Sequence, residues 1–149
     1  MTARDLPSAV LFCCTMNAIR SPMAEGLMKR MHGRRLYVQS VGVLAGEPDP
    51  LMAAAMDEVG NDMSRHRPRT FADLEDDSFD VVVSLSPEAQ HRAVELTRDR
   101  DCLVEYWPTF DPALVEGSRA QRLDAYRAVR DDLAQRIRRR FRPLALPRE

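Results

Sequence analysis

The chain has few cysteines and no long apolar run. Three cysteines among 149 residues are an odd number without metal-ligand spacing, which argues against a disulfide framework and a zinc site and fits a reducing cytoplasm. No run of about eighteen apolar residues occurs, and the N-terminal stretch MTARDLPSAVLF lacks the apolar core of a signal peptide. These absences predict a cytoplasmic protein without a membrane segment, a metal ion or a cofactor.

A large net charge is also missing. The 22 basic residues nearly balance the 23 acidic ones, so no overall field points to nucleic acid or to a membrane. Lys29 is the only lysine, and the other basic residues are arginines. Five of them gather near the C-terminus: Arg136, Arg138, Arg139, Arg140 and Arg142. We expect a solvated helix end, where cations suit the helix dipole, and contact with an anionic partner is the alternative.

The rest of the chain alternates short apolar runs with segments of helical periodicity. Strands are predicted at residues 9–13, 36–41, 79–85 and 102–106. Helices are predicted at residues 21–33, with Ser21 as N-cap, and at 50–59, 87–96 and 118–141. The alternation predicts one α/β domain over residues 1–149, built as a three-layer sandwich with a central four-stranded parallel sheet and helices on both faces.

The first strand leads into a polar loop that opens a helix. In a parallel sheet, ligands lie beyond the carboxyl ends of the strands. Successive backbone amides of this loop and the helix N-terminus can surround a tetrahedral oxyanion, and Arg20 offers a fork of donors to the same anion. The residues expected to bind the anion are Thr15, Met16, Asn17, Ala18, Ile19 and Ser21. Cys14 is the candidate nucleophile, whereas Cys13 still belongs to the strand and is expected to be buried. The alternative is an ordinary strand-to-helix turn with a buried cysteine.

The stretch CTMNAIRSPMAEG resembles the phosphate loop of the low-molecular-weight protein tyrosine phosphatases and of the related thioredoxin-linked arsenate reductases. The resemblance continues in QSVGV, NDMSRHRPR and WPTFDPA, and it covers most of the chain. It implies that Cys14 is the nucleophile, that Asn17 shapes the loop and that Arg20 binds the oxyanion. It also implies that the Ser21 hydroxyl hydrogen-bonds the thiolate.

Asp111 is the candidate general acid. Cleaving a phosphate ester with a thiolate requires a proton for the leaving oxygen, and a carboxyl group on a neighbouring loop is suited to supply it. Without the resemblance, Asp111 before Pro112 would be interpreted as a turn residue. The resemblance implies instead that Asp111 is the catalytic acid.

Two loop residues depart from the family pattern. Met16 stands where the family usually has glycine, the residue that tolerates unusual dihedral angles cheaply. The loop shape then depends on Asn17, which can adopt a left-handed conformation. Ile19 stands where the family often has a second cysteine, so the usual disulfide partner of an oxidised nucleophile is missing. A bond between the adjacent Cys13 and Cys14 would be strained.

The last third of the chain resembles the arsenate reductases more than the tyrosine phosphatases. Those reductases need a cysteine relay, because two electrons must leave through a disulfide. The corresponding stretch SLSPEAQHRAVEL has no cysteine, and Ser86 occupies the first relay position. Cys102 is the remaining candidate, and it is predicted to belong to the core.

The sequence therefore predicts a cysteine-dependent phosphomonoesterase that acts through a phosphocysteine intermediate. A phosphotyrosine protein is the first choice of substrate, and another small phosphate monoester is the second. Tyr106, Trp107 and Phe110 are candidates for stacking on an aryl group, with core packing as the alternative. Two other functions stay open: an arsenate reductase that uses an external thiol such as glutathione or mycothiol, and a non-catalytic oxyanion-binding module.

Overall fold

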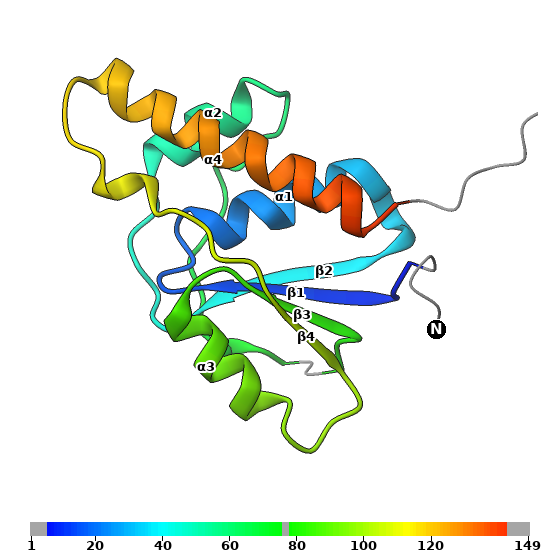
Figure 1. Cartoon of the computed structure of the whole chain (residues 1–149). Helices are drawn as coiled ribbons and strands as arrows, with labels where there is room; N and C mark the ends of the chain where they lie inside the picture. The colour runs from blue at the N-terminus through cyan, green and yellow to red at the C-terminus, as the bar shows by residue number, and fades with distance from the viewer. Residues whose placement is uncertain (1–5, 76–77, 143–149) are drawn as a thin grey trace, which may run out of the picture.

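The computed structural model describes residues 6–75 and 78–142. Four parallel strands form one sheet in the order β2-β1-β3-β4. The strands are β1 (Ala9–Cys14), β2 (Tyr37–Gly42), β3 (Val81–Ser84) and β4 (Leu103–Tyr106). The α-helices are α1 (Arg20–His32), α2 (Pro50–Asp57), α3 (Pro87–Leu96) and α4 (Arg119–Arg140). Helices α1, α2 and α4 cover one face of the sheet and α3 covers the other (Figure 1), so the predicted three-layer arrangement is confirmed.

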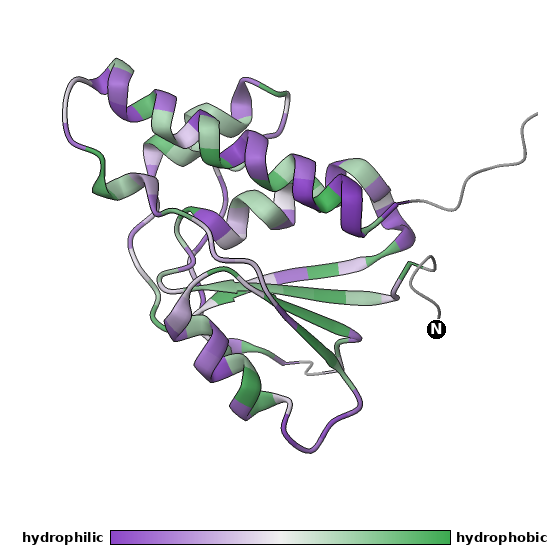
Figure 2. Cartoon of the chain, viewed as in Figure 1, coloured by the Kyte–Doolittle hydropathy of each residue, from purple (hydrophilic) through white to green (hydrophobic). Residues whose placement is uncertain are grey.

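Strand β1 lies in the middle of the molecule, and all six of its residues are buried. The strand is hydrophobic along its whole length (Figure 2), as expected where both faces of the sheet are covered by helices. Phe12 and Cys14 point into the core formed with α1, α2 and α4. Leu11 and Cys13 point into the smaller core under α3. The two adjacent cysteines therefore face opposite sides of the sheet.

Helix α4 closes the larger core. Its predicted apolar stripe is buried: Leu123, Tyr126, Leu133, Ile137 and, directly after the helix, Phe141. Ser118 caps its N-terminus in a reciprocal arrangement with Gln121. No helix within residues 6–75 and 78–142 has both the length and the apolar composition to cross a membrane.

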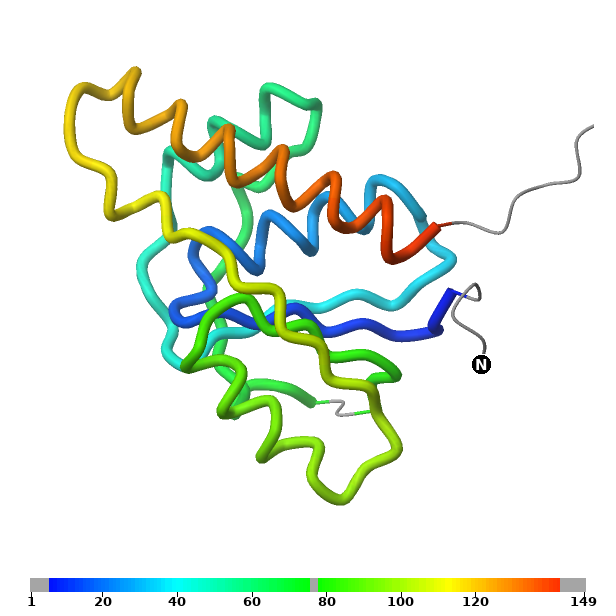
Figure 3. Tube along the Cα trace, viewed as in Figure 1, coloured from blue at the N-terminus to red at the C-terminus, as the bar shows by residue number. Residues whose placement is uncertain are grey.

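The boundaries differ from the prediction at several ends. Helix α1 begins at Arg20 rather than after a Ser21 cap, because the Ser21 hydroxyl is bonded to Cys14 instead. Strand β1 continues to Cys14, and helix α2 ends at Asp57, before the turn at Gly60. Short 3-10 helices lie at η1 (Gly33–Arg35), η2 (Phe71–Asp73) and η3 (Pro112–Leu114). The loop after β1 and the segment after β2 run side by side at the carboxyl end of the sheet (Figure 3).

Candidate active site

The loop between β1 and α1 bends at Asn17. Its φ of 51° makes it the one non-glycine residue with positive φ in the part of the chain that the structure describes. Met16, which replaces the glycine usual in the family, therefore needs no left-handed conformation. Gly42 of β2 lets the loop approach, because a Cβ there would lie 2.7 Å from the Asn17 backbone nitrogen. The loop thus reaches its shape without a glycine of its own.

Asn17 is held by hydrogen bonds from three other segments, and its side chain is fully buried. Its Nδ2 donates to Ser21 Oγ at 2.8 Å and to Ser40 Oγ at 3.0 Å. Its Oδ1 accepts from the Arg69 backbone nitrogen at 2.9 Å, and its backbone oxygen lies 2.8 Å from His66 Nε2. These contacts tie the loop to α1, to β2 and to the segment after α2.

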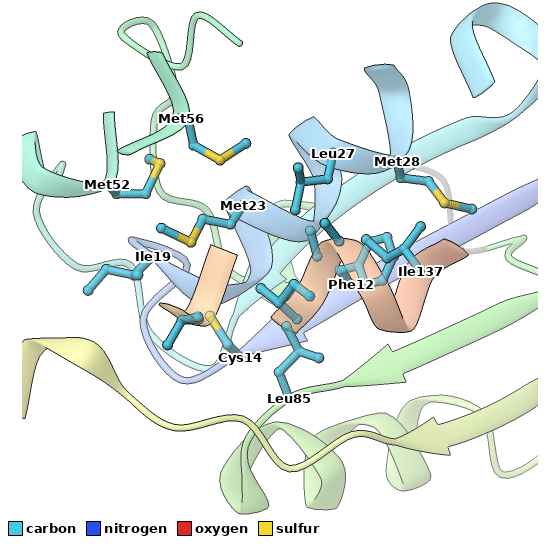
Figure 4. Close-up of a cluster of buried hydrophobic side chains, with 14 of the residues drawn as sticks. Phe12, Cys14, Ile19, Met23, Leu27, Met28, Met52, Met56, Leu85 and Ile137 are labelled. Atoms are coloured by element: carbon cyan, nitrogen blue, oxygen red, sulfur yellow. The ribbon is translucent and has the colours of Figure 1, made fainter. Parts of the chain in front are cut away.

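Cys14 lies at the base of the loop, at the margin of the larger core (Figure 4). Its Sγ is 2.9 Å from Ser21 Oγ. The Ser21 oxygen accepts a hydrogen from Asn17, and its own hydrogen has two acceptors within reach, the Cys14 sulfur and the Val41 carbonyl at 3.3 Å. The expected hydrogen bond from Ser21 to Cys14 is therefore geometrically available.

Arg20 and Asp111 lie close to each other and line the same pocket as Cys14. Arg20 Nη1 donates to the Thr109 carbonyl at 3.0 Å, and its Nη2 lies 4.0 Å from Asp111 Oδ2. Asp111 Oδ1 accepts from the Ala113 nitrogen at 3.0 Å and so caps η3. The loop after β4 thereby brings Asp111 next to the arginine, with Pro112 as the first residue of η3.

A pocket of about 180 Å³ joins these groups. The predicted site residues that line it are Cys14, Met16, Ala18, Ile19, Arg20 and Asp111. Thr15, Asn17 and Ser21 are not among its lining residues: the Thr15 hydroxyl lies 2.9 Å from Ser86 Oγ, and the side chains of Asn17 and Ser21 are buried behind the loop. The structure thus brings six of the predicted residues to one cavity, and the other three support the loop that forms it.

The sequence interpretation missed the far wall of this pocket. Gly46, Glu47, Asp49 and Ala113 also line it. Asp49 caps α2 through Oδ1 and accepts a hydrogen bond from the buried Tyr126 hydroxyl at 2.8 Å. The Asp49-Pro50 pair is a helix-start signal in the sequence, but no local pattern indicates that this cap faces the pocket.

All three cysteines lie among the described residues, and the side chains of Cys13 and Cys102 do not share the pocket with Cys14. Cys13 is fully buried on the other face of the sheet, and burial raises its pKa well above the usual value. Cys102 lies directly before β4, and the strand register places Leu103 level with Val10. Cys14 is four residue steps along β1 from Val10, which is roughly 13 Å and more than a disulfide can span.

Cys102 is half-buried, and burial raises its pKa as well. Ser86, at the predicted first relay position, caps α3. Within the described ranges, no group of three or more histidine, cysteine or acidic side chains is arranged to hold a metal ion.

Comparison with known proteins agrees with this geometry. The family described as low molecular weight phosphotyrosine protein phosphatase matches residues 9–146. An arsenate reductase of Halalkalibacterium halodurans is 32% identical over 129 residues, which are 87% of this chain and 91% of that protein. A glutaredoxin arsenate reductase of Synechocystis is 30% identical over 128 residues, 86% of this chain and 92% of the relative.

Among solved structures, the YwlE arginine phosphatase from Geobacillus stearothermophilus superposes with a TM-score of 0.73 at 25% identity, covering 89% of this chain and 90% of its own. Phosphatases and arsenate reductases thus share this fold and this length of chain. Because the family match extends from β1 past the end of α4, the chain belongs to the low-molecular-weight phosphotyrosine protein phosphatase family of enzymes.

Proposed function

We propose that this enzyme is a cysteine-dependent phosphomonoesterase with Cys14 as nucleophile, Arg20 as oxyanion binder and Asp111 as general acid and base. The observation that carries the proposal is the contact between Cys14 Sγ and Ser21 Oγ in a pocket that Arg20 and Asp111 also line. Neither of the other two cysteines can reach Cys14, so the chain holds a nucleophile without an internal electron relay. Hydrolysis of a phosphate ester requires only such a nucleophile.

The first step transfers the phosphoryl group to sulfur. The backbone amides of residues 15–20 and the free N–H groups of Arg20 hold the phosphate oxygens. The Cys14 thiolate attacks phosphorus, an S–P bond forms and the ester P–O bond breaks. Asp111 gives its proton to the departing oxygen, which leaves as an alcohol or phenol.

The second step releases phosphate. The Asp111 carboxylate takes a proton from a water molecule, whose oxygen attacks phosphorus. The S–P bond breaks, its electron pair returns to Cys14, and inorganic phosphate departs. The Ser21 hydroxyl donates to the sulfur as this negative charge returns, and Asp111 is again protonated for the next cycle.

The substrate is a phosphorylated protein or a small phosphate monoester. Phe110, next to Asp111, is 57% exposed and is available to contact a leaving group. Trp107 does not line this pocket, and its ring packs against Phe12 and Phe141. An aryl phosphate such as phosphotyrosine therefore fits this site best.

The test is steady-state hydrolysis of para-nitrophenyl phosphate between about pH 5 and 7. Cys14→Ser is expected to reduce turnover to the buffer rate, and Asp111→Asn to lower kcat by about 10²- to 10⁴-fold. Cys102→Ser, which removes a thiol outside the pocket, serves as the control and should retain full activity. Full activity of Cys14→Ser, or no turnover by folded wild-type protein, would overturn the proposal.

A second candidate function is arsenate reduction with an external thiol, and the similarity to the arsenate reductases favours it. Cys14 would displace a hydroxide from arsenate to form an S–As bond. An external thiol would then attack the Cys14 sulfur, the electron pair of the S–As bond would pass to arsenic, and arsenite would leave. A second thiol would reduce the mixed disulfide and restore Cys14. Arsenite formation that requires glutathione or a glutaredoxin, without phosphate ester hydrolysis, would favour this function over the phosphatase.

A further inference from the structure

A second cavity lies beside the loop that carries Asp111. It is a groove of about 640 Å³ between the end of β4 and the C-terminal half of α4. Its lining residues are Tyr106, Trp107, Pro108, Arg136, Arg139 and Arg140. One wall is therefore aromatic and the other is cationic. We call this cavity the α4 groove.

The α4 groove carries positive charge in a chain whose net charge is near zero. Arg140 pairs with Glu105 at 2.6 Å and Arg136 pairs with Asp132 at 3.0 Å, but neither acid is among the lining residues. Arg139 is exposed and has no ion-pair or side-chain hydrogen-bond partner among residues 6–75 and 78–142. At least one guanidinium thus faces the groove without a compensating carboxylate.

The buried Thr109 lies between the α4 groove and the proposed phosphate site and contacts an arginine of each. The Thr109 carbonyl accepts from Arg20, and the Thr109 hydroxyl lies 3.4 Å from Arg136 Nη1. The same loop runs on from the groove at Pro108 to Asp111 in the pocket. Figure 1 shows it leaving β4 and passing beneath α4 toward η3. A substrate that fills the pocket and extends along this loop would enter the groove within a few residues.

We propose that the α4 groove binds an acidic, extended segment of a phosphorylated protein substrate, next to the residue that is dephosphorylated. The inference rests on the proposed function. A small monoester fits within the 180 Å³ pocket, so only a substrate with a chain beyond the phosphate can use the groove. Carboxylates of that chain pair with Arg139 and compete for Arg136 and Arg140, and its apolar atoms lie on Tyr106 and Trp107.

The first experiment compares two phosphotyrosine peptides, one flanked on each side by four glutamates and one by four glutamines. Wild-type protein is expected to show a KM about three- to fivefold lower for the glutamate peptide, the size expected for one or two exposed ion pairs. Arg139→Glu should abolish this preference, and Arg139→Lys should keep most of it. Arg98→Glu, which reverses an exposed arginine beyond α3, is the matched control and should change nothing.

Hydrolysis of para-nitrophenyl phosphate separates this inference from the proposed function. Arg139→Glu should leave kcat/KM for that substrate within about twofold, because the ester does not reach the α4 groove. Equal KM values for the two peptides with an active enzyme would overturn the groove proposal and leave the phosphatase proposal standing.

A binding measurement tests the α4 groove without catalysis. Trp107 is the only tryptophan of the chain, so its fluorescence reports directly on this cavity. An unphosphorylated glutamate peptide should change the Trp107 emission of the wild-type protein in a saturable way. The change should be weaker at high salt and absent in Arg139→Glu. A response to an oligonucleotide but not to the peptide would overturn the proposal in favour of a nucleic-acid surface.

Discussion

Asn17 is the residue on which the shape of the loop between β1 and α1 depends. It combines a positive φ with a fully buried amide that contacts Ser21 and Ser40 and accepts from the Arg69 backbone. Both properties come from one side chain, because asparagine tolerates the left-handed region and offers donors and an acceptor at once. Neither alanine nor glycine supplies both.

Substitution of Asn17 separates these two properties. Asn17→Gly keeps the backbone conformation and loses the side-chain hydrogen bonds, which should lower the free energy of unfolding by about 1–3 kcal/mol. Asn17→Ala loses the same bonds and adds about 1 kcal/mol of left-handed strain. Urea denaturation checks that Asn17→Ala has a lower free energy of unfolding than Asn17→Gly. Both variants should lose most of the turnover of aryl phosphates. Equal stability of the two variants would show that the backbone conformation contributes nothing.

Much of the candidate site was predictable at the scale of single residues. Cys14, Arg20 and Asp111 were predicted from a strand-loop-helix order and a family resemblance, and the structure brings their side chains to one pocket. Glu47 and Asp49 were not predicted to line it. They follow β2, and only the parallel pairing of β1 with β2 places that segment beside the loop. No local sequence pattern predicts which strand pairs with β1.

At the scale of elements, a hydrogen bond connects α4 to the start of α2. Tyr126 is 1% exposed, and its hydroxyl donates to Asp49 Oδ2 while Asp49 Oδ1 caps α2. Burial, together with the Asp49 carboxylate, raises the pKa of Tyr126 well above its usual value. The tyrosine therefore stays protonated and remains a donor.

Tyr126→Phe removes this donor and keeps the ring. We expect a loss of about 1–2 kcal/mol in the free energy of unfolding, since a hydrogen bond to a charged acceptor is lost and Asp49 can partly recruit water. KM for aryl phosphates should rise as well, because Asp49 lines the pocket. Tyr37→Phe is the control: Tyr37 is 46% exposed, and the change should cost less than about 0.5 kcal/mol. A Tyr126→Phe variant as stable as wild type would contradict this account.

Element identity followed from periodicity, whereas element ends did not. Helix α3 occupies the predicted residues, and α4 lies within one residue of its predicted range because Ser118 is a local cap. The predicted start of α1 was wrong, because Ser21 was expected to be the N-cap and the helix begins at Arg20. A serine followed by proline resembles an N-cap, yet the Ser21 hydroxyl is used by Cys14 across the loop. The N-terminal end of α1 is therefore set by a tertiary contact and not by a local cap.

At the scale of the whole molecule, the cysteines are distributed so that none can protect Cys14. Cys13 faces the other core, and Cys102 lies at the opposite end of the sheet. Peroxide is therefore expected to oxidise Cys14 without forming an intramolecular disulfide, and added thiol should restore activity only at the sulfenic stage. Intact mass measurement after brief oxidation checks this. Loss of two hydrogens from the monomer, in place of added oxygen, would contradict it.

The junction of α1 with the end of α4 gives the molecule a stability that depends on pH. His32, the last residue of α1, is 4% exposed, and both of its ring nitrogens are buried. Burial lowers the pKa of His32 from 6.5, the Phe141 backbone partly opposes this shift, and Arg35 adds to it. The folded protein thus holds a neutral imidazole where the unfolded chain takes up a proton.

Because the unfolded state binds more protons below pH 6.5, the stability contribution of His32 is full above that pH and is lost as the pH falls below it. His32→Leu should therefore flatten the decline in unfolding free energy between about pH 7.5 and 5, measured by urea denaturation. Glu58 does not interfere, since hydrogen bonds from Arg127 and Arg130 hold its pKa at about 2. His91→Gln alters an exposed histidine and should keep the wild-type slope. If His32→Leu kept the wild-type slope too, the pH dependence of the unfolding free energy would have to arise from groups other than His32.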